Sequence, residues 1–415
     1  MGLFEVLKSK KENYALALDI GTEFVKALIF KIEGEKGSVI GVGKKRQRLS
    51  DMQGGAVTDI QGVIKNCLWA LDEAQRQAKK RVSQTIIGIA GELVKGSTTT
   101  VRYQRDNPKA NITLNELKEI VEKVQEKAFE KTRSQLAWET GHREIDVKLV
   151  NAAIVDVKVD GFKVTNPLGF QGKEVEVGIF NAFAPIVHLG ALESIANALD
   201  LDLLSIAAEP YAVARCIGLE EMPDFSAIFM DVGGGTTDIA VVRNGGVEGT
   251  KMFALGGRAF TRRISEAMAL SFEKAEEIKI KYSKNKLPAK IKEQVEKSLL
   301  PDAEVWLSGV ELTLSEFPLD LLPSRILLCG GGSALPEIKE ILQTSSWVSR
   351  LPFAKPPSIR FLKPEEVVNI KDETGLLKEP ADVTPMALAN LAIDLVGEET
   401  VVEGILSKIV RALKT

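Results

Sequence analysis

Two stretches of the chain, half its length apart, share one pattern of hydrophobic and polar positions. Residues 16–30 read LALDIGTEFVKALIF, and residues 228–242 read IFMDVGGGTTDIAVV. Each begins as an apolar run, reaches an aspartate and a glycine-containing turn, and continues as a second β-prone run. The pattern predicts a strand–turn–strand hairpin at both places.

The two predicted hairpins align on their aspartates. When Asp19 is placed on Asp231, Gly21 falls on Gly233. A single Asp-x-Gly turn is common, whereas two copies between apolar runs indicate an internal repeat. We therefore predict a duplicated α/β core whose two halves face each other.

A third glycine cluster occurs in residues 325–342, RILLCGGGSALPEIKEIL. Its pattern predicts a buried strand, a tight turn and a helix that begins at Pro336. The glycine spacing is neither the dinucleotide-binding fingerprint nor a Walker P-loop. Backbone at such a turn can approach a flat ring or a ribose closely. The turn itself consists of four small residues: Gly330, Gly331, Gly332 and Ser333.

Glycine-rich turns at strand ends can bind phosphate. Without a Cβ, their backbone N–H groups can crowd around phosphate oxygens as an anion-binding nest. A Mg²⁺ on those phosphates keeps most of its waters and takes few protein carboxylates. We expect Asp19 and Asp231 to face such a Mg²⁺, and Thr236 and Thr237 to add hydrogen bonds. The alternative is that all three turns are purely structural.

Composition restricts the function classes only modestly. The 415 residues carry a net charge of -3, which gives no general reason to expect nucleic-acid binding. No apolar run approaches the roughly 18 residues of a membrane span, and the N-terminal residues do not have the order of a secretion signal. Three scattered cysteines and two histidines predict neither a disulfide framework nor a metal knuckle. We expect a cytoplasmic protein.

The three turns carry a family resemblance. DIGT, DVGGGTTD and CGGGSALP resemble the phosphate-1, phosphate-2 and adenosine motifs of the actin, sugar-kinase and DnaK-type chaperone superfamily, and AAEPYAVA (207–214) resembles its connecting motif. The resemblance implies a duplicated, actin-like (ribonuclease H-like) ATPase fold with two lobes around a nucleotide cleft. ATP and Mg²⁺ are the implied cofactors.

Further stretches favour one branch of this superfamily. They fall in the order found in FtsA, the bacterial cell-division actin homologue, and the resemblance covers most of residues 13–396. The type IV pilus protein PilM shares this architecture and is the alternative. The stretches are GGAVTDIQGVIKNCLWALDEA (54–74), ITLNELKEIVEKVQEKA (112–128), DGFKVTNPLG (160–169), LGGRAFTRRI (255–264) and KAEEIKIKY (274–282).

The resemblance also implies roles for individual residues. Asp19 and Asp231 would order Mg²⁺, directly or through water, and Glu209 would align the attacking water, so Glu209 and Asp231 are the catalytic candidates. Glu276 and Lys279, three apart on one helix face, would reach ribose and adenine. The remaining predicted cofactor contacts are Gly21, Thr22, Gly233, Gly234, Gly235, Thr236, Thr237, Gly257, Gly330, Gly331, Gly332 and Ser333.

The implied organisation has four subdomains and a tail. The insertion, strand–helix–strand–strand, resembles the 1C subdomain that FtsA and PilM carry instead of actin's 1B, a protein-interaction surface in both families. Its helix is predicted to open at Thr113 with Glu116 three residues on. The boundaries are 13–90 and 185–205 for 1A, 91–184 for 1C, 206–255 and 322–396 for 2A, 256–321 for 2B, and 398–415 for a C-terminal helix.

Two departures from the family pattern affect function. Glu23 stands where a Ser or Thr normally follows the phosphate-1 Gly-Thr, and its carboxylate would repel a triphosphate unless it turned away or bound the metal. Subdomain 2B is short, and part of 2B contacts FtsZ tails in FtsA. The first departure argues against fast hydrolysis, and the second bears on which partner subdomain 2B contacts.

The end of the chain, EETVVEGILSKIVRALKT, has an apolar stripe at helical spacing between Val401 and Leu413, with Lys408, Arg411 and Lys414 on or beside the opposite face. This resembles the membrane-targeting helix of FtsA in position and charge, but it has no interfacial Trp or Phe. The alternative is a helix that docks on 2A or on a partner.

The leading hypothesis is an FtsA-like protein that binds ATP, self-associates into filaments and links a cytoplasmic, FtsZ-like division partner to the inner face of the membrane through 1C, 2B and its C-terminal helix. The alternative is a PilM-like pilus-assembly adaptor. A small-molecule kinase is a third hypothesis, disfavoured because the insertion is of the wrong type and no convincing base is visible. Any enzyme activity would be at most a slow, Mg²⁺-dependent ATPase.

Overall fold

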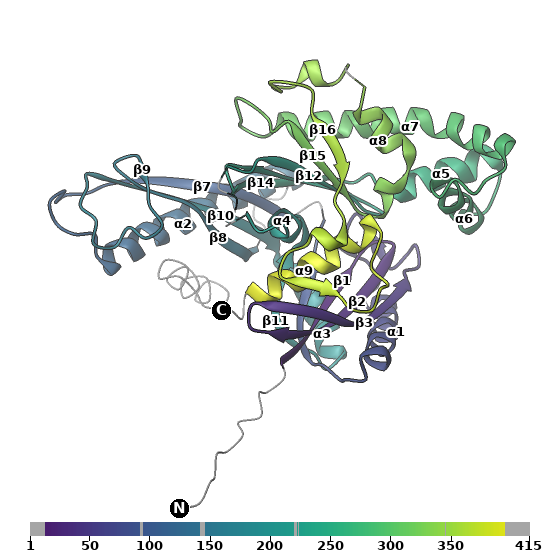
Figure 1. Cartoon of the computed structure of the whole chain (residues 1–415), viewed down its shortest axis with the longest axis horizontal. Helices are drawn as coiled ribbons and strands as arrows, with labels where there is room; N and C mark the ends of the chain where they lie inside the picture. Colours follow the sequence, from purple (N-terminus) through teal and green to yellow (C-terminus); the bar gives the residue numbers. More distant parts are fainter. Residues whose placement is uncertain are drawn as a thin grey trace, which may run out of the picture.

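Among the described residues, two large β-sheets form the cores of two lobes, and an arm projects from one side (Figure 1). The computed structural model describes residues 13–91, 94–141, 146–219, 222, 224–344 and 346–394. The predicted C-terminal helix over 398–415 lies outside these residues, as do residues 1–12.

The first lobe contains the first predicted hairpin. In the part of the chain that the structure describes, its sheet has six strands in the order β11-β6-β1-β2-β3-β17. β1 pairs antiparallel with β2, and β2 with β3, whereas β6 runs parallel to both β1 and β11. The strands are β1 (Asn13–Ile20), β2 (Phe24–Glu33), β3 (Lys36–Arg46), β6 (Gln84–Ile89), β11 (Asp202–Ala208) and β17 (Ile370–Asp372), and a separate short ribbon joins β4 (Met52–Gln53) and β5 (Ala56–Val57).

The second lobe repeats this arrangement. Its strands follow the order β14-β13-β12-β15-β16, which matches β3-β2-β1-β6-β11 strand for strand. The directions match too, since β12 is antiparallel to β13 and parallel to β15, which in turn is parallel to β16. The prediction of a duplicated α/β core is confirmed. The strands are β12 (Ala227–Val232), β13 (Thr237–Arg243), β14 (Gly246–Phe253), β15 (Arg325–Cys329) and β16 (Ser358–Phe361).

The predicted insertion forms the projecting arm. Its elements come in the expected order of strand, helix, strand and strand, and the long helix α2 packs on β7 and β10. Thr113 caps α2 by accepting a hydrogen bond from the backbone N–H of Glu116, as the sequence predicts. The elements are β7 (Lys95–Gln104), α2 (Leu114–Thr140), β8 (Val147–Val159), β9 (Phe162–Lys163) and β10 (Glu174–Pro185).

The arm is joined to the second lobe by its sheet, which the sequence did not predict. Ser97 and Gly96 on β7 pair with Gly249 and Thr250 on β14, so one continuous sheet runs from the second lobe into the arm. A side chain at Gly96 would meet the Thr250 hydroxyl 2.2 Å away. The glycine therefore permits the junction, and the arm is an extension of the second lobe's sheet.

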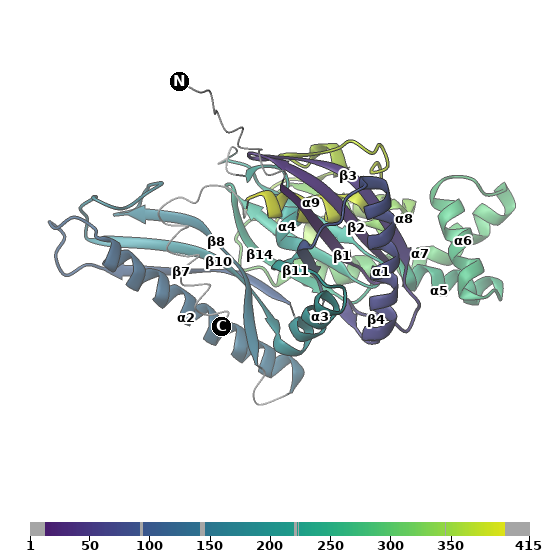
Figure 2. The same cartoon turned by 90° about the horizontal axis from the view of Figure 1, so that it is seen from below.

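Helices connect the parallel strands and cover the sheets (Figures 1 and 2). Parallel neighbours cannot be joined by a tight turn, so each such connection crosses over the sheet through other elements. α1 lies between β3 and β6 in sequence, α8 lies between β15 and β16, and α5, α6 and α7 precede β15. The helices are α1 (Ile60–Ala78), α3 (Ile186–Ala198), α5 (Gly257–Met268), α6 (Phe272–Ser283), α7 (Ala289–Ser315) and α8 (Pro336–Leu342).

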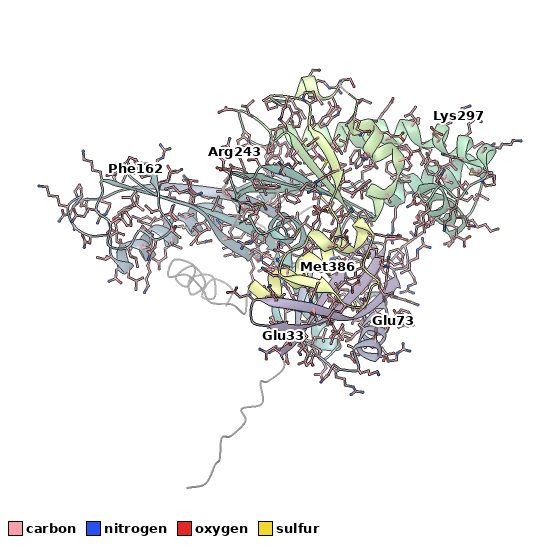
Figure 3. All side chains as sticks on the ribbon, viewed as in Figure 1. Glu33, Glu73, Phe162, Arg243, Lys297 and Met386 are labelled. Atoms are coloured by element: carbon pink, nitrogen blue, oxygen red, sulfur yellow. The ribbon has the colours of Figure 1, made fainter. Side chains whose placement is uncertain are left out.

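Two helices lie between the lobes and join their cores. α4 (Glu209–Arg215) packs on the second sheet, α9 (Val383–Asp394) packs on the first, and the two helices contact each other. Figure 3 shows Met386 of α9 in this central position, with Phe162 at the tip of the arm and Lys297 at the opposite end of the molecule. A single hydrophobic core therefore includes residues of both sheets, such as Phe30 and Phe229.

The subdomain boundaries stay a prediction, and two elements cross them. Residues 322–396 were assigned to 2A, yet β17 pairs with β3 and α9 packs on β1, both in the first lobe. The apolar face of α9 is almost completely buried there. No helix among the described residues has both the length and the apolar character that a bilayer span requires.

The packing of α1 on β3 depends on Gly41 and Gly43 of the strand, where a Cβ would collide with the backbone of the helix. A Cβ at Gly43 would lie 1.8 Å from the Ala70 carbonyl oxygen, whereas a Cβ at Gly190 on α3 would meet nothing within 4 Å. Gly43→Ala should therefore lower the free energy of unfolding by about 1–3 kcal/mol through overpacking. Gly190→Ala is the control and should raise it by up to about 1 kcal/mol through helix propensity. Urea denaturation measures both, and equal effects would contradict the packing described here.

Candidate functional site

A cavity of about 480 Å³ lies where the turns of the two hairpins meet the third glycine cluster. The structure brings fourteen of the predicted site residues to its wall, although they come from distant parts of the sequence. They are Asp19, Gly21, Thr22, Glu209, Asp231, Gly233, Gly234, Thr236, Gly257, Glu276, Lys279, Gly330, Gly331 and Gly332.

Three predicted residues do not line this cavity. The hydroxyl of Thr237 donates to the Leu255 carbonyl at 2.8 Å and accepts from the indole N–H of Trp306 at 2.9 Å, so it is committed to the core of the second lobe. The hydroxyl of Ser333 donates to the Gly330 carbonyl at 2.7 Å and stabilises its own turn. Gly235 faces the first hairpin. Their predicted contact with a ligand stays a prediction.

The glycines of the second turn allow the two hairpins to touch. A Cβ at Gly234 would lie 2.7 Å from the Cβ of Glu23, and one at Gly235 would lie 2.8 Å from the Thr22 side chain. Carbon atoms cannot approach so closely, so any larger residue would push the turns apart. Close approach of the lobes is a second physical reason for the run of glycines, in addition to the predicted phosphate binding.

Four carboxyl groups lie near one another at one end of the cavity. Burial raises the pKa of Glu209 well above its ordinary value, and the nearby Asp19, Asp238 and Asp231 raise it further. Burial likewise raises the pKa of Asp231, although the Thr384 hydroxyl donates to its carboxylate and opposes the shift. The pKa of Asp238 rises to about 7, because of burial and the neighbouring Asp231. This concentration of negative charge favours a bound cation.

Lys26 is a cation at this end of the cavity that sequence reasoning missed. Its ammonium group lies 3.1 Å from the Asp19 carboxylate and donates to the Ala381 carbonyl at 2.6 Å. Burial lowers the pKa of Lys26, but the attraction of Asp19, with Asp382 and Asp231 beyond it, outweighs burial and raises the pKa overall. Lys26 follows Asp19 by seven residues on β2, so both side chains project from paired positions of one hairpin.

Glu23 does not present a free carboxylate to the cavity. Its two oxygens accept hydrogen bonds from Arg46 at 2.6 Å and from Arg258 at 2.7 Å. The expected repulsion of a phosphate group is therefore offset by two guanidinium charges. The sequence could not indicate this, because Arg258 lies 235 residues away on the other lobe.

The opposite wall of the cavity is formed by one face of α6. Glu276 and Lys279 form an ion pair at 2.7 Å, and the hydroxyl of Thr261 on α5 donates to Glu276. Lys279 also donates to the Gly257 carbonyl at 2.8 Å. The Glu276–Lys279 pair therefore lies on the cavity wall and is held by α5. A charged sequence such as KAEEIKIKY, taken alone, is more often a solvated helix face.

The third turn requires glycine at its first position. Gly330 has φ +82°, and a Cβ there would lie 2.0 Å from an Asp231 carboxylate oxygen. Its N–H donates to the Pro380 carbonyl at 3.0 Å, which ties the turn to the segment before α9. After it, residues Gly331–Ala334 form a single 3₁₀ turn and α8 begins at Pro336.

These groups suit an anionic ligand with a flat end. Glycine turns leave backbone exposed on one side, Lys26 supplies positive charge, and the acidic groups could hold a hydrated Mg²⁺ between themselves and phosphate oxygens. Among the described residues, no set of three or more His, Cys, Asp or Glu side chains forms a ready-made metal site. The residues present fit a Mg²⁺ that keeps most of its waters, and Asp19 and Asp231 on the cavity wall would hold it.

The repeated five-strand order and the cavity between the lobes define the class of protein: an actin-like, two-lobed α/β fold with the strand–helix–strand–strand insertion. Within this class the chain is similar to FtsA. A family model described as "Cell division protein FtsA" matches residues 228–387. The predicted resemblance to FtsA is therefore confirmed.

Curated relatives extend the similarity beyond that range. FtsA of Neisseria meningitidis serogroup B is 23% identical over 412 residues, covering 94% of this chain and 92% of the relative. FtsA of Streptococcus pneumoniae serotype 2 is 24% identical over 390 residues, covering 89% and 82% respectively. The alignments thus include both lobes and the arm.

Solved structures show the same fold. A PilM–PilN type IV pilus biogenesis complex matches with a TM-score of 0.62 and 18% identity, covering 91% of this chain and 98% of that one. The ethanolamine utilization protein EutJ from Carboxydothermus hydrogenoformans matches with a TM-score of 0.50 and 16% identity, covering 91% and 89%. PilM, the stated alternative, is thus a structural neighbour.

The contact between the two turns makes a prediction that needs no ligand. Gly234→Ala should lower the free energy of unfolding by about 1–3 kcal/mol, because its Cβ would overlap the Cβ and backbone of Glu23. Gly331→Ala changes the same cavity, but its Cβ would meet only Ala381 at 3.8 Å, and its effect should stay within about 0.5 kcal/mol. Denaturant titration of both variants is the measurement. If the two variants were equally stable, the turns would not be in contact.

Proposed function

We propose that the protein is an ATP-binding, actin-like adaptor of the cell-division type. It self-associates and links a cytoplasmic partner, FtsZ-like in character, to the inner face of the membrane. The observation that carries the proposal is the cavity itself, where three glycine turns, Lys26 and the Glu276–Lys279 pair surround one space.

The two ends of the cavity suit the two ends of ATP. The turns after β1 and β12 carry the backbone groups and the acidic side chains that a Mg²⁺-bearing phosphate chain requires. The third turn, at Gly331 and Gly332, and the α6 face offer room for ribose and adenine. Bound Mg²⁺ would neutralise phosphate charge, while Glu209 could orient a water at the phosphate end.

ATP serves in this proposal as a ligand that closes the two lobes, and its hydrolysis is slow or regulatory. Glu209 is half-buried on the cavity wall, and desolvation together with the nearby aspartates raises its pKa, which favours the neutral acid over the carboxylate that would act as a base. The similarity to FtsA over most of the chain supports an adaptor more than a small-molecule kinase. The arm and subdomain 2B are the proposed partner surfaces.

A PilM-like pilus-assembly adaptor is the second candidate. The structural likeness to the PilM–PilN complex, which covers 98% of that chain, favours it. Both candidates include ATP in the same cavity. They differ in whether residues 398–415 bind a membrane, so lipid binding separates them.

ATP binding is tested by isothermal titration of the full chain with ATP and Mg²⁺. Lys26→Met should weaken binding by roughly 10- to 100-fold, since it removes a charge-assisted hydrogen bond to phosphate worth about 1.5–3 kcal/mol. Lys251→Met is the control, because Lys251 pairs with Glu316 away from the cavity and should leave affinity unchanged. The absence of saturable ATP binding by the unmodified protein would refute the proposal.

Membrane attachment is tested by liposome flotation with ATP and Mg²⁺. Only the full chain should float with anionic vesicles, and a chain truncated after residue 397 should stay at the bottom, because an apolar stripe and three cations bind weakly but additively to anionic lipid. ATP should increase flotation if self-association links several tethers. If neither chain floats, the membrane link is refuted and the pilus-type adaptor is favoured.

A further inference from the structure

Arg258 connects the two lobes at the mouth of the cavity. It lies in the first turn of α5 in the second lobe, and all three of its guanidinium nitrogens donate hydrogen bonds to the first lobe. Nε donates to Glu23 at 2.7 Å, Nη2 to the Thr22 carbonyl at 2.6 Å, and Nη1 to the Met52 carbonyl at 3.1 Å. The fork geometry of arginine allows one side chain to make all three bonds at once.

Glu23 is shared between two arginines and largely withdrawn from water. Its second oxygen accepts from Arg46 of β3 at 2.6 Å, and both the Glu23 and Arg258 side chains are only 13% exposed. Exposed ion pairs contribute little, whereas breaking a buried pair leaves an uncompensated charge. Loss of either arginine from the Arg46–Glu23–Arg258 cluster should therefore cost more than loss of an exposed ion pair.

Both ends of the cluster are fixed to the turns that line the cavity. The backbone N–H groups of Arg258 and Gly257 donate to the Gly234 and Gly233 carbonyls at 2.7 and 2.9 Å, so the start of α5 is tied to the second turn. Glu23 itself belongs to the first turn, and its carbonyl accepts from the Gln47 N–H at 2.9 Å. The cluster thus links the cavity turn of one lobe to the cavity turn of the other.

We propose that the Arg46–Glu23–Arg258 cluster is an inter-lobe latch that holds the cavity closed and limits how fast its ligand leaves. Arg258 is a positioning residue, since it acts on the two turns and does not line the cavity. The claim that the latch limits ligand release rests on the proposed function, because it assumes that the ligand is ATP or ADP. A Ser or Thr in place of Glu23, the usual residue in the family resemblance, could not hold two guanidinium groups.

The latch is tested first without any nucleotide. Spin labels are attached to Lys65→Cys on α1 and Lys290→Cys on α7, both exposed, while the three native cysteines are buried. Double electron–electron resonance then measures the distance between the two labels, one on each lobe, in the full chain. Glu23→Gln, Glu23→Ser and Arg258→Gln should shift the distribution to longer distances. An unchanged distribution in these variants would overturn the latch.

Arg263→Gln is the matched control. Arg263 lies on the same helix and makes a bidentate ion pair with Asp302 of α7, at 2.9 and 2.8 Å, entirely within the second lobe. The Arg263→Gln variant loses a bidentate pair with a carboxylate, although Arg263 is more exposed than Arg258, and it should leave the distance unchanged. A shift as large as that of Arg258→Gln would mean that any lost ion pair loosens the lobes, and the proposal would be wrong.

Release of a fluorescent ATP analogue, chased with excess ATP, is the second readout. Glu23→Gln and Arg258→Gln should release it about 10-fold faster than the unmodified protein, equivalent to about 1.4 kcal/mol. If both variants released the analogue at the rate of the unmodified protein, the latch would not control how fast the ligand leaves. If the unmodified protein binds no analogue, the proposed function fails, whereas the distance measurement still decides whether the latch exists.

Discussion

The close approach of two backbone turns, one from each lobe, is the constraint on which the rest of the structure depends. The turns after β1 and β12 touch because Gly234 and Gly235 carry no side chain. Around this contact the acidic groups, Lys26 and the third glycine turn come within reach of one ligand. The same contact explains why the two halves of a duplicated fold form one site, and it places the Arg46–Glu23–Arg258 cluster where it can hold the lobes together.

The fold and most of the site could be predicted from the sequence because both rest on local patterns. Apolar runs that end in Asp-x-Gly specify hairpins through residues adjacent in the chain, and a Thr-x-x-Glu start marks the helix of the arm. The repeat of the hairpin then implied two facing halves. Fourteen of the predicted site residues line one cavity for this reason, since each turn carries its own residues to the meeting point of the lobes.

The missed features all depend on contacts between distant segments. In the sequence, Lys26 is an ordinary polar position on a strand. Only the fold shows that its side chain is largely buried beside Asp19. From the sequence alone, Glu23 is expected to repel a phosphate group, but in the structure its carboxylate pairs with Arg258 of the other lobe. The strand β17 is three residues long and carries no pattern of its own, so its return to the first sheet could not be predicted. Thr237 belongs to the glycine motif, but its hydroxyl is buried in the core, where it accepts a hydrogen bond from Trp306.

In the function proposed here, ATP occupies the cavity and contacts all three turns at once. Backbone hydrogen exchange, followed by mass spectrometry with and without ATP and Mg²⁺, tests it most directly. The account predicts slower exchange in residues 19–26, 231–238 and 330–335 together when ATP is present. Exchange that slows in none of these segments, or in only one of them, would contradict a nucleotide site shared by the two lobes.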